Sequence, residues 1–289
     1  MIVVGLDVGS RYVHVYVMEI ARPKVDYVIE QIRDPKTPTP KGLLKYSLPT
    51  GGKKSEVAEK AYVEALKQLK MRRSDVARVW ATGKYGKQAT FAGHFVTDAV
   101  ANTHGVLLKV RNAKTIIDVG ARGYRAIKIS QDGSVLDMAV SEQGTAGAPG
   151  MLHERAAGVL ELTVQEMSEA SLKSTLAIFD KGKYSVFDIS DVISLMHQNV
   201  SKNDIARAVY DAIAAKVASV AQFIGLEDDV AIVGGMAKNA GFVQALKLAT
   251  GKDIKEPHNP EFVCAFGAAV AAAAGTVDEK IRTKSSKKK

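Results

Sequence analysis

Cysteine is almost absent from this sequence, which has a single one, Cys264, among its 289 residues. One thiol excludes a disulfide within the chain, and no Cys-x-x-Cys pair or cysteine-histidine cluster offers a zinc site. Because Cys264 stands in an apolar stretch, we interpret it as a small buried hydrophobic residue. The chain must fold without covalent cross-links, and 46% hydrophobic residues over this length suffice for a large core.

Long apolar runs are also missing. The most apolar segment, 262–274, is predicted to be a buried helix, because a bilayer-spanning helix needs about 20 apolar residues. The N-terminal strand lacks the basic region and cleavage site of a signal peptide. We therefore expect a soluble, cytoplasmic protein with no membrane partner.

The excess of basic residues lies at the C-terminus. The net charge is +9, yet residues 1–279 contain 34 basic and 31 acidic residues, and the other six basic residues fall in 280–289. The segment 276–289 is polar and aperiodic, which predicts a disordered basic tail. No aromatic-basic stripe or recognition motif is present, which disfavours nucleic acid as a partner.

One short pattern occurs twice. An apolar strand leads into Asp7-Val8-Gly9 and again into Asp118-Val119-Gly120, and a second apolar strand follows each copy. Glycine allows the turn amides to approach phosphate oxygens, while the carboxylate can hold Mg²⁺. Either copy alone fits an ordinary hairpin turn. The duplication favours two similar halves with a metal-nucleotide between them.

A third element follows the strand 230–233. The pair Gly234-Gly235 opens a helix at 240–249, and such a bare turn lets an adenosine or a ribose approach the backbone. Together the three elements resemble the phosphate 1, phosphate 2 and adenosine motifs of the actin, sugar kinase and heat-shock ATPase superfamily. This resemblance implies an α/β fold of two ribonuclease H-like domains with a nucleotide cleft between them.

Within that superfamily the sequence resembles the BadF/BadG/BcrA/BcrD type of ATPase. These are the ATPases of benzoyl-CoA reductase and the activators of 2-hydroxyacyl-CoA dehydratases. Ala121 with Arg125-Ala126-Ile127 looks more like the smaller ATPase subunit of the reductase, which favours a heteromeric partner. The segments that carry the resemblance are Ala81-Thr82-Gly83, 117–121, 233–239 and 265–269.

The resemblance implies ATP and Mg²⁺ as cofactors and assigns a role to each site residue. Asp7 and Asp118 are the catalytic carboxylates and position the metal, directly or through water. Arg122 stands where activators carry Gln, so the efficiency of hydrolysis stays open. The residues expected to bind the nucleotide are Gly9, Ser10, Arg11, Gly120 and Ala121 at the phosphates and Gly234, Gly235, Lys238 and Asn239 at the adenosine.

The sequence departs from these families at their iron-sulfur ligands. The families hold one 4Fe-4S cluster across a subunit interface with two cysteines per subunit, but Gly144 and Tyr184 occupy those positions here. This chain alone is therefore expected to hold no cluster. Its expected partners are a related ATPase subunit or iron-sulfur subunits of a reductase or dehydratase, in a hetero- or homo-oligomer.

The predicted domains are 1–112 and 113–275, with 262–275 as a candidate closing helix of the first, followed by the tail 276–289. Periodicity and capping residues predict the elements inside them. Strands are expected at 25–29, at 76–81 and three times up to residue 140; loops at 34–40 and 144–150; and helices at 55–69 with Ser55 as cap, 97–110, 151–160, 163–170 with a Thr163-Glu166 capping box, and 203–223.

Two other functions stay open. A small-molecule kinase of the same fold would need a catalytic base, for which Asp188 and Asp191 are the candidates. A non-catalytic nucleotide-dependent scaffold would bind ATP without turnover. We interpret the scattered histidines as surface or hydrogen-bonded residues and not as catalysts: His94, His104, His153, His197 and His258.

Overall fold

The computed structural model describes residues 1–21, 40–142, 148–179 and 187–275. These form two compact units. The first combines Met1–Lys114, Ile127–Asp137 and Phe262–Lys289, and the second combines Thr115–Ala126 and Met138–Glu261. Several predictions lie outside the described residues: the strand 25–29, the loop 34–40 except its last residue, the start of the loop 144–150 with Gly144, Tyr184, and the tail 276–289.

The first unit is built on a five-stranded sheet of order β3-β2-β1-β4-β5. Strand β1 lies in the centre, antiparallel to β2 and parallel to β4. The third strand, β3, was not predicted, because Lys41, Gly42 and Lys45 interrupt its apolar alternation. The strands are β1 (Ile2–Val8), β2 (Tyr12–Glu19), β3 (Lys41–Pro49), β4 (Arg78–Thr82) and β5 (His94–Phe95).

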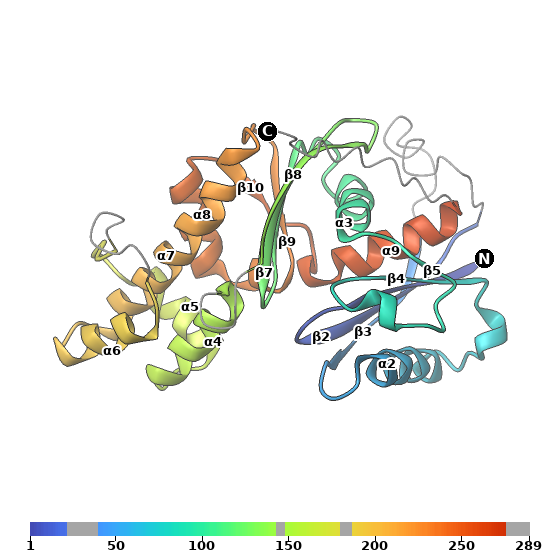
Figure 1. Cartoon of the computed structure of the whole chain (residues 1–289), viewed down its shortest axis with the longest axis horizontal. Coiled ribbons are helices and arrows are strands. Elements are labelled where there is room, and N and C mark those ends of the chain that lie inside the picture. Colours follow the sequence, from blue (N-terminus) through green and yellow to red (C-terminus); the bar gives the residue numbers. More distant parts are fainter. Residues whose placement is uncertain (22–39, 143–147, 180–186, 276–289) are drawn as a thin grey trace, which may run out of the picture. The chain divides into compact units, whose positions relative to one another are not determined.

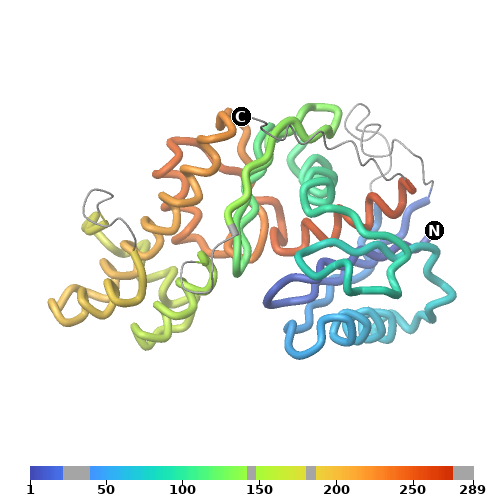
Figure 2. The backbone as a smooth tube through the Cα atoms, viewed as in Figure 1, coloured from blue at the N-terminus to red at the C-terminus, as the bar shows by residue number. Residues whose placement is uncertain are grey.

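Helices α2 (Lys54–Gln68), α3 (Asp98–Leu107) and α9 (Val263–Ala274) complete the first unit. The alanines of α2 pack on Val4, Leu6 and Val8 of β1. Side chains alternate along a strand, so the other face of β1 is free for α9. Figure 2 shows that C-terminal helix, in red, beside the N-terminal strands, in blue.

The packing of α9 depends on glycines. A Cβ on Gly5 of β1 would collide with the carbonyl oxygen of Ala265, and one on Gly267 would collide with that of Ala101 in α3. The prediction of a closely packed buried helix at 262–274 is thereby confirmed. Among the described residues, no helix combines the length and the apolar character needed to cross a membrane.

The second unit has a sheet of order β10-β9-β6-β7-β8, in which β9 is parallel to both β6 and β10. The central strand is again the first one along the chain, as in the first unit. Figure 1 shows β7 and β8 as long neighbouring strands in green. The strands are β6 (Thr115–Val119), β7 (Gly123–Ile129), β8 (Val135–Glu142), β9 (Val230–Val233) and β10 (Ile254–Lys255).

Five helices form the rest of the second unit, and their buried faces share one core with β6 and β9. The capping box of Thr163 and Glu166 is confirmed, with the Thr163 hydroxyl accepting from the Glu166 amide at 3.1 Å. In the first unit, by contrast, the predicted cap at Ser55 is wrong, because α2 already starts at Lys54. The five helices are α4 (Pro149–Val159), α5 (Val164–Leu172), α6 (Ile189–His197), α7 (Lys202–Phe223) and α8 (Ala240–Thr250).

Candidate functional site

The first Asp-Val-Gly turn joins β1 to β2. Asp7 and His14 are cross-strand partners, and the Gly9 amide donates to the Tyr12 carbonyl at 3.0 Å, which closes the turn. Ser10 is half-buried and Arg11 is exposed. The turn therefore presents its outer residues to solvent, while its carboxylate stays at the end of a buried strand.

A glycine from the neighbouring strand lies against this carboxylate. Gly83 follows β4 with φ +89°, and a Cβ there would collide with Oδ1 of Asp7. Oδ1 of Asp98, in the first turn of α3, accepts from the Gly83 amide at 2.7 Å and from the Thr82 hydroxyl at 3.0 Å. Sequence reasoning missed Asp98, because nothing local links it to Gly83.

The second Asp-Val-Gly turn, between β6 and β7, is closed in the same way. The Gly120 amide donates to the Gly123 carbonyl at 2.9 Å. Asp118 forms an ion pair with Arg125, whose Nε lies 3.3 Å from Oδ2 of Asp118. Ala121 is backed by α4, since a Cβ on Gly150 would lie 2.7 Å from the Ala121 Cα.

The glycine pair after β9 repeats the arrangement at Gly83. Gly234 has φ +91°, and a Cβ there would lie 2.7 Å from Oδ1 of Asp118 and 2.5 Å from the carbonyl oxygen of Val119. Gly235 has no atom within 4 Å of where its Cβ would be, so this peptide is open to a ligand. Both turns of the duplicated unit thus combine a carboxylate with a positive-φ glycine.

The last two residues of the Gly-Gly turn point in different directions. Lys238 is exposed and pairs with Glu261 at 3.2 Å. Asn239 is 7% exposed: its Nδ2 donates to the Tyr210 hydroxyl at 2.8 Å, and its Oδ1 accepts from the Phe242 amide at 2.9 Å. The Asn239 side chain therefore caps α8 and anchors the turn to α7.

A cavity of about 230 Å³ lies between α5, α7 and α8, beside Gly241. Leu172 and Leu248 form an exposed apolar rim, while Arg207 and Asp211 pair with each other at 3.4 Å. Burial raises the pKa of Asp211 above its ordinary value, an effect that Arg207 opposes. An apolar rim over a few polar groups suits a flat heteroaromatic ring, and this cavity was not found from the sequence.

His153 of α4 packs edge-on against Tyr210, with ring centroids 5.6 Å apart. It is 5% exposed, and within the described part of the chain neither ring nitrogen has a hydrogen-bond partner. Burial lowers the pKa of His153 from its ordinary 6.5 to about 4. The interpretation of His153 as a surface or hydrogen-bonded residue is therefore wrong: it is a neutral core histidine.

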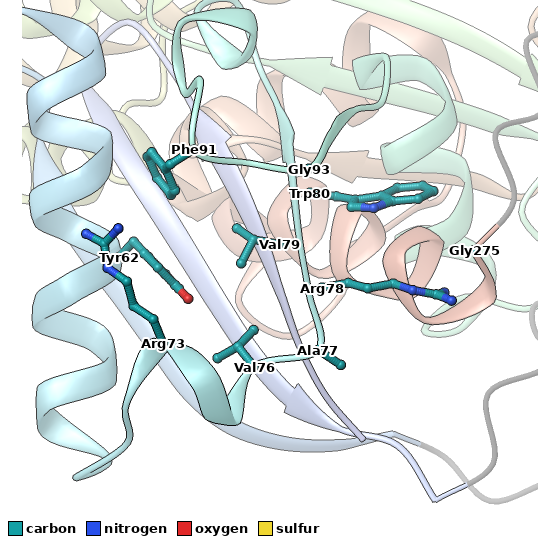
Figure 3. A pocket seen from close by; sticks show the side chains of 10 residues that line it. All are labelled: Tyr62, Arg73, Val76, Ala77, Arg78, Val79, Trp80, Phe91, Gly93 and Gly275. Carbon is teal, nitrogen blue, oxygen red and sulfur yellow. The ribbon is translucent and has the colours of Figure 1, made fainter.

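A second cavity, of about 540 Å³, lies in the first unit at the start of β4 (Figure 3). Arg78 and Trp80 point to one side of β4 and Val79 to the other. The Arg78 guanidinium donates to the carbonyl of Ala272 at 2.8 Å, and Tyr62 stacks on Phe91 with centroids 5.4 Å apart. Its main polar and aromatic groups thus bond to the protein itself, at the end of β4 opposite Gly83.

Within the described residues, no cluster of three or more histidine, cysteine or acidic side chains is arranged to hold a metal. Asp7 and Asp118 each bring one carboxylate to a turn with open amides. This donor set fits Mg²⁺, which binds through one or two carboxylates together with substrate phosphates. Cys264 is half-buried, less so than predicted, with its sulfur 3.9 Å from the Thr82 hydroxyl.

Two sheets with a duplicated strand-turn-strand unit define the actin-like ATPase fold, and solved structures agree. The activator of 2-hydroxyisocaproyl-CoA dehydratase from Clostridium difficile, solved with bound ADPNP, superposes with a TM-score of 0.81 at 24% identity, covering 95% of each chain. The Acidaminococcus fermentans (R)-2-hydroxyglutaryl-CoA dehydratase component A gives 0.82 at 24% identity, covering 96% of this chain and 100% of the other.

The chain belongs to the BadF/BadG/BcrA/BcrD ATPase family, whose model matches residues 4–272. The activator of lactoyl-CoA dehydratase from Anaerotignum propionicum is 29% identical over 94% of this chain and 97% of its own length. A subunit of benzoyl-CoA reductase from Thauera aromatica is 26% identical over 66% and 67%. The predicted fold and family are confirmed, and the alignment with this activator extends over more of the chain than that with the reductase subunit.

Proposed function

We propose that this protein binds Mg-ATP and hydrolyses it, and that the resulting conformational change supports low-potential electron transfer by a partner enzyme. The observation that carries the proposal is the duplicated site: each Asp-Val-Gly carboxylate lies against a positive-φ glycine from the neighbouring strand. A side chain at either glycine would fill the space beside the carboxylate. Family membership supplies the ATPase activity.

In this proposal Asp7 and Asp118 orient the metal, which when bound neutralises phosphate charge. The phosphates are held by the backbone around Gly9, Ser10 and Arg11 and around Gly120 and Ala121. Amides fixed in a turn serve this purpose without reorganising during the reaction.

The adenosine is proposed to lie on Gly234, Gly235 and Lys238. Gly235 has the open space that a ribose needs. Asn239 contributes by holding the turn, because both ends of its amide are engaged inside the protein. The purine base would enter the cavity beside Gly241, between Leu172 and Leu248.

The partner is proposed from the relatives. Two of them are named as activators of 2-hydroxyacyl-CoA dehydratases and one as a subunit of benzoyl-CoA reductase. Cluster irons need thiolate ligands, and this sequence has one cysteine. We therefore propose that any iron-sulfur cluster is held by partner subunits, and that the complex works in the cytoplasm.

The kinase alternative loses its candidate bases. Oδ1 of Asp188 accepts from the Ser190 amide at 2.7 Å, and Oδ2 of Asp191 accepts from the Asp188 amide at 2.8 Å. Both carboxylates form the capping box of α6. They serve helix formation and are not poised as general bases.

The test is anaerobic isolation of the protein from its own host, with identification of the co-purifying chains and assays of iron and of Mg-ATP hydrolysis. We expect iron-sulfur subunits to accompany it and to stimulate phosphate release. Isolation as a single iron-free chain without ATP turnover would overturn the proposal. ATP binding without turnover, with or without partners, would instead support the scaffold.

A further inference from the structure

The two copies of the strand-turn-strand unit differ at one equivalent position. The residue seven places after the first aspartate, Asp7, is His14, and the residue seven places after Asp118 is Arg125. In the first copy His14 is turned to other partners: its Nδ1 lies 2.7 Å from the Ser47 hydroxyl, and its ring packs edge-on against Phe262 at 4.9 Å. The second copy instead places a permanent cation beside its carboxylate.

The pair of Arg125 and Asp118 is largely shielded from solvent. The side chains are 22% and 16% exposed, and Nε of Arg125 lies 3.3 Å from Oδ2 of Asp118. Such a pair is screened less by salt than a surface pair, and a guanidinium stays charged at every physiological pH. Oδ1 of the same carboxylate lies beside Gly234, so the ion pair is part of the turn region itself.

A carboxylate that already faces a guanidinium attracts a divalent cation less strongly. The guanidinium has five N–H donors, and the contact through Nε leaves its terminal amino groups suited to a phosphate oxygen. The second turn can therefore favour phosphate through a built-in positive charge, whereas the first turn has no arginine at the matching position.

We propose that Arg125 acts as a fixed cation at the second turn: it positions Asp118, lowers the dependence of nucleotide binding on Mg²⁺, and leaves Asp7 as the principal carboxylate for the metal. This inference rests on the proposed function. It assigns unequal roles to the two aspartates, although their local sequences are the same.

The test compares the affinity for AMPPNP, measured by calorimetry, in saturating Mg²⁺ and in EDTA. For Arg125→Gln we expect the ratio of the two dissociation constants to rise about tenfold, because a charge-assisted contact is lost in the metal-free complex. Arg125→Lys should keep most of the wild-type ratio. His14→Gln, the matched change in the first copy, should leave the ratio unchanged.

The outcomes separate this inference from the proposed function. If the wild-type protein binds no AMPPNP in either condition, the proposed function fails. If it binds but Arg125→Gln keeps the wild-type ratio, or His14→Gln changes it equally, the role of Arg125 is wrong. Should Arg125→Gln not fold, a wild-type ratio for Arg125→Lys supports the inference, and a ratio raised tenfold in that folded variant contradicts it.

Discussion

The α-carbon of Gly83 lies against the carboxylate of Asp7, so that any side chain at position 83 would collide with Oδ1. Asp7 and Thr82 are register partners of β1 and β4, which brings the next residue, Gly83, to this position. The second unit repeats the relationship, with Asp118 opposite Val233 and Gly234 following. The duplicated element thus includes a contact between neighbouring strands as well as the hairpin.

Replacing either glycine should destabilise the fold through two effects. Gly234→Ala places a Cβ at φ +91° and 2.7 Å from Oδ1 of Asp118. We expect a loss of about 3 kcal/mol in the free energy of unfolding, from backbone strain and overpacking together. Chemical denaturation measures it. Gly251→Ala is the matched control, since Gly251 has φ +66° with no neighbour within 4 Å, and should cost about 1 kcal/mol. Equal losses would show that the contact with Asp118 is unimportant.

Neutralising the turn carboxylates should abolish turnover without unfolding the protein. Asp7→Asn keeps the shape of the side chain but removes the charge that orients the metal, so we expect ATP hydrolysis to fall at least about 100-fold. Phosphate release is the measurement, at an ATP concentration that saturates each variant. Asp253→Asn, an exposed change, is the control. Wild-type turnover by Asp7→Asn would remove this residue from the site.

Tyr210 should matter for both stability and nucleotide affinity. Tyr210→Phe removes the acceptor for Nδ2 of Asn239 and leaves a buried amide unsatisfied, which costs about 1–3 kcal/mol. Because Asn239 ends the Gly-Gly turn, AMPPNP binding should weaken as well. Tyr12→Phe, at an exposed tyrosine, should change neither quantity. If Tyr210→Phe lowers stability but keeps the wild-type affinity, Asn239 does not hold the adenosine turn.

His153 should make the fold acid-sensitive. Its pKa is about 4 in the folded protein and 6.5 ordinarily, so between these values the unfolded chain binds a proton that the folded chain does not. The free energy of unfolding therefore falls as the pH drops from 6.5 towards 4, by about 1.4 kcal/mol per pH unit from this group. Denaturation at several pH values should show a shallower decline for His153→Leu. His197→Gln, at an exposed histidine, should follow the wild-type curve.

The sequence was sufficient to predict those features that depend on local pattern. The duplicated Asp-Val-Gly turns, the glycine pair and the capping box of Thr163 are each encoded within a few residues. The contacts of Asp98 with Gly83 and of Tyr210 with Asn239 were not predictable, because they join segments 15 and 29 residues apart through the tertiary fold. His153 shows the same limit, since burial depends on how α4 packs against α7.

The glycine-mediated seat of α9 also bears on how the protein is made. The first unit needs Phe262–Lys289, so its central strand has no complete core until nearly the whole chain has left the ribosome. The second unit ends at Glu261 and is available to fold earlier. The half that is synthesised first is therefore finished last, and a nascent chain stopped before α9 would expose the apolar back of β1, a natural target for chaperones.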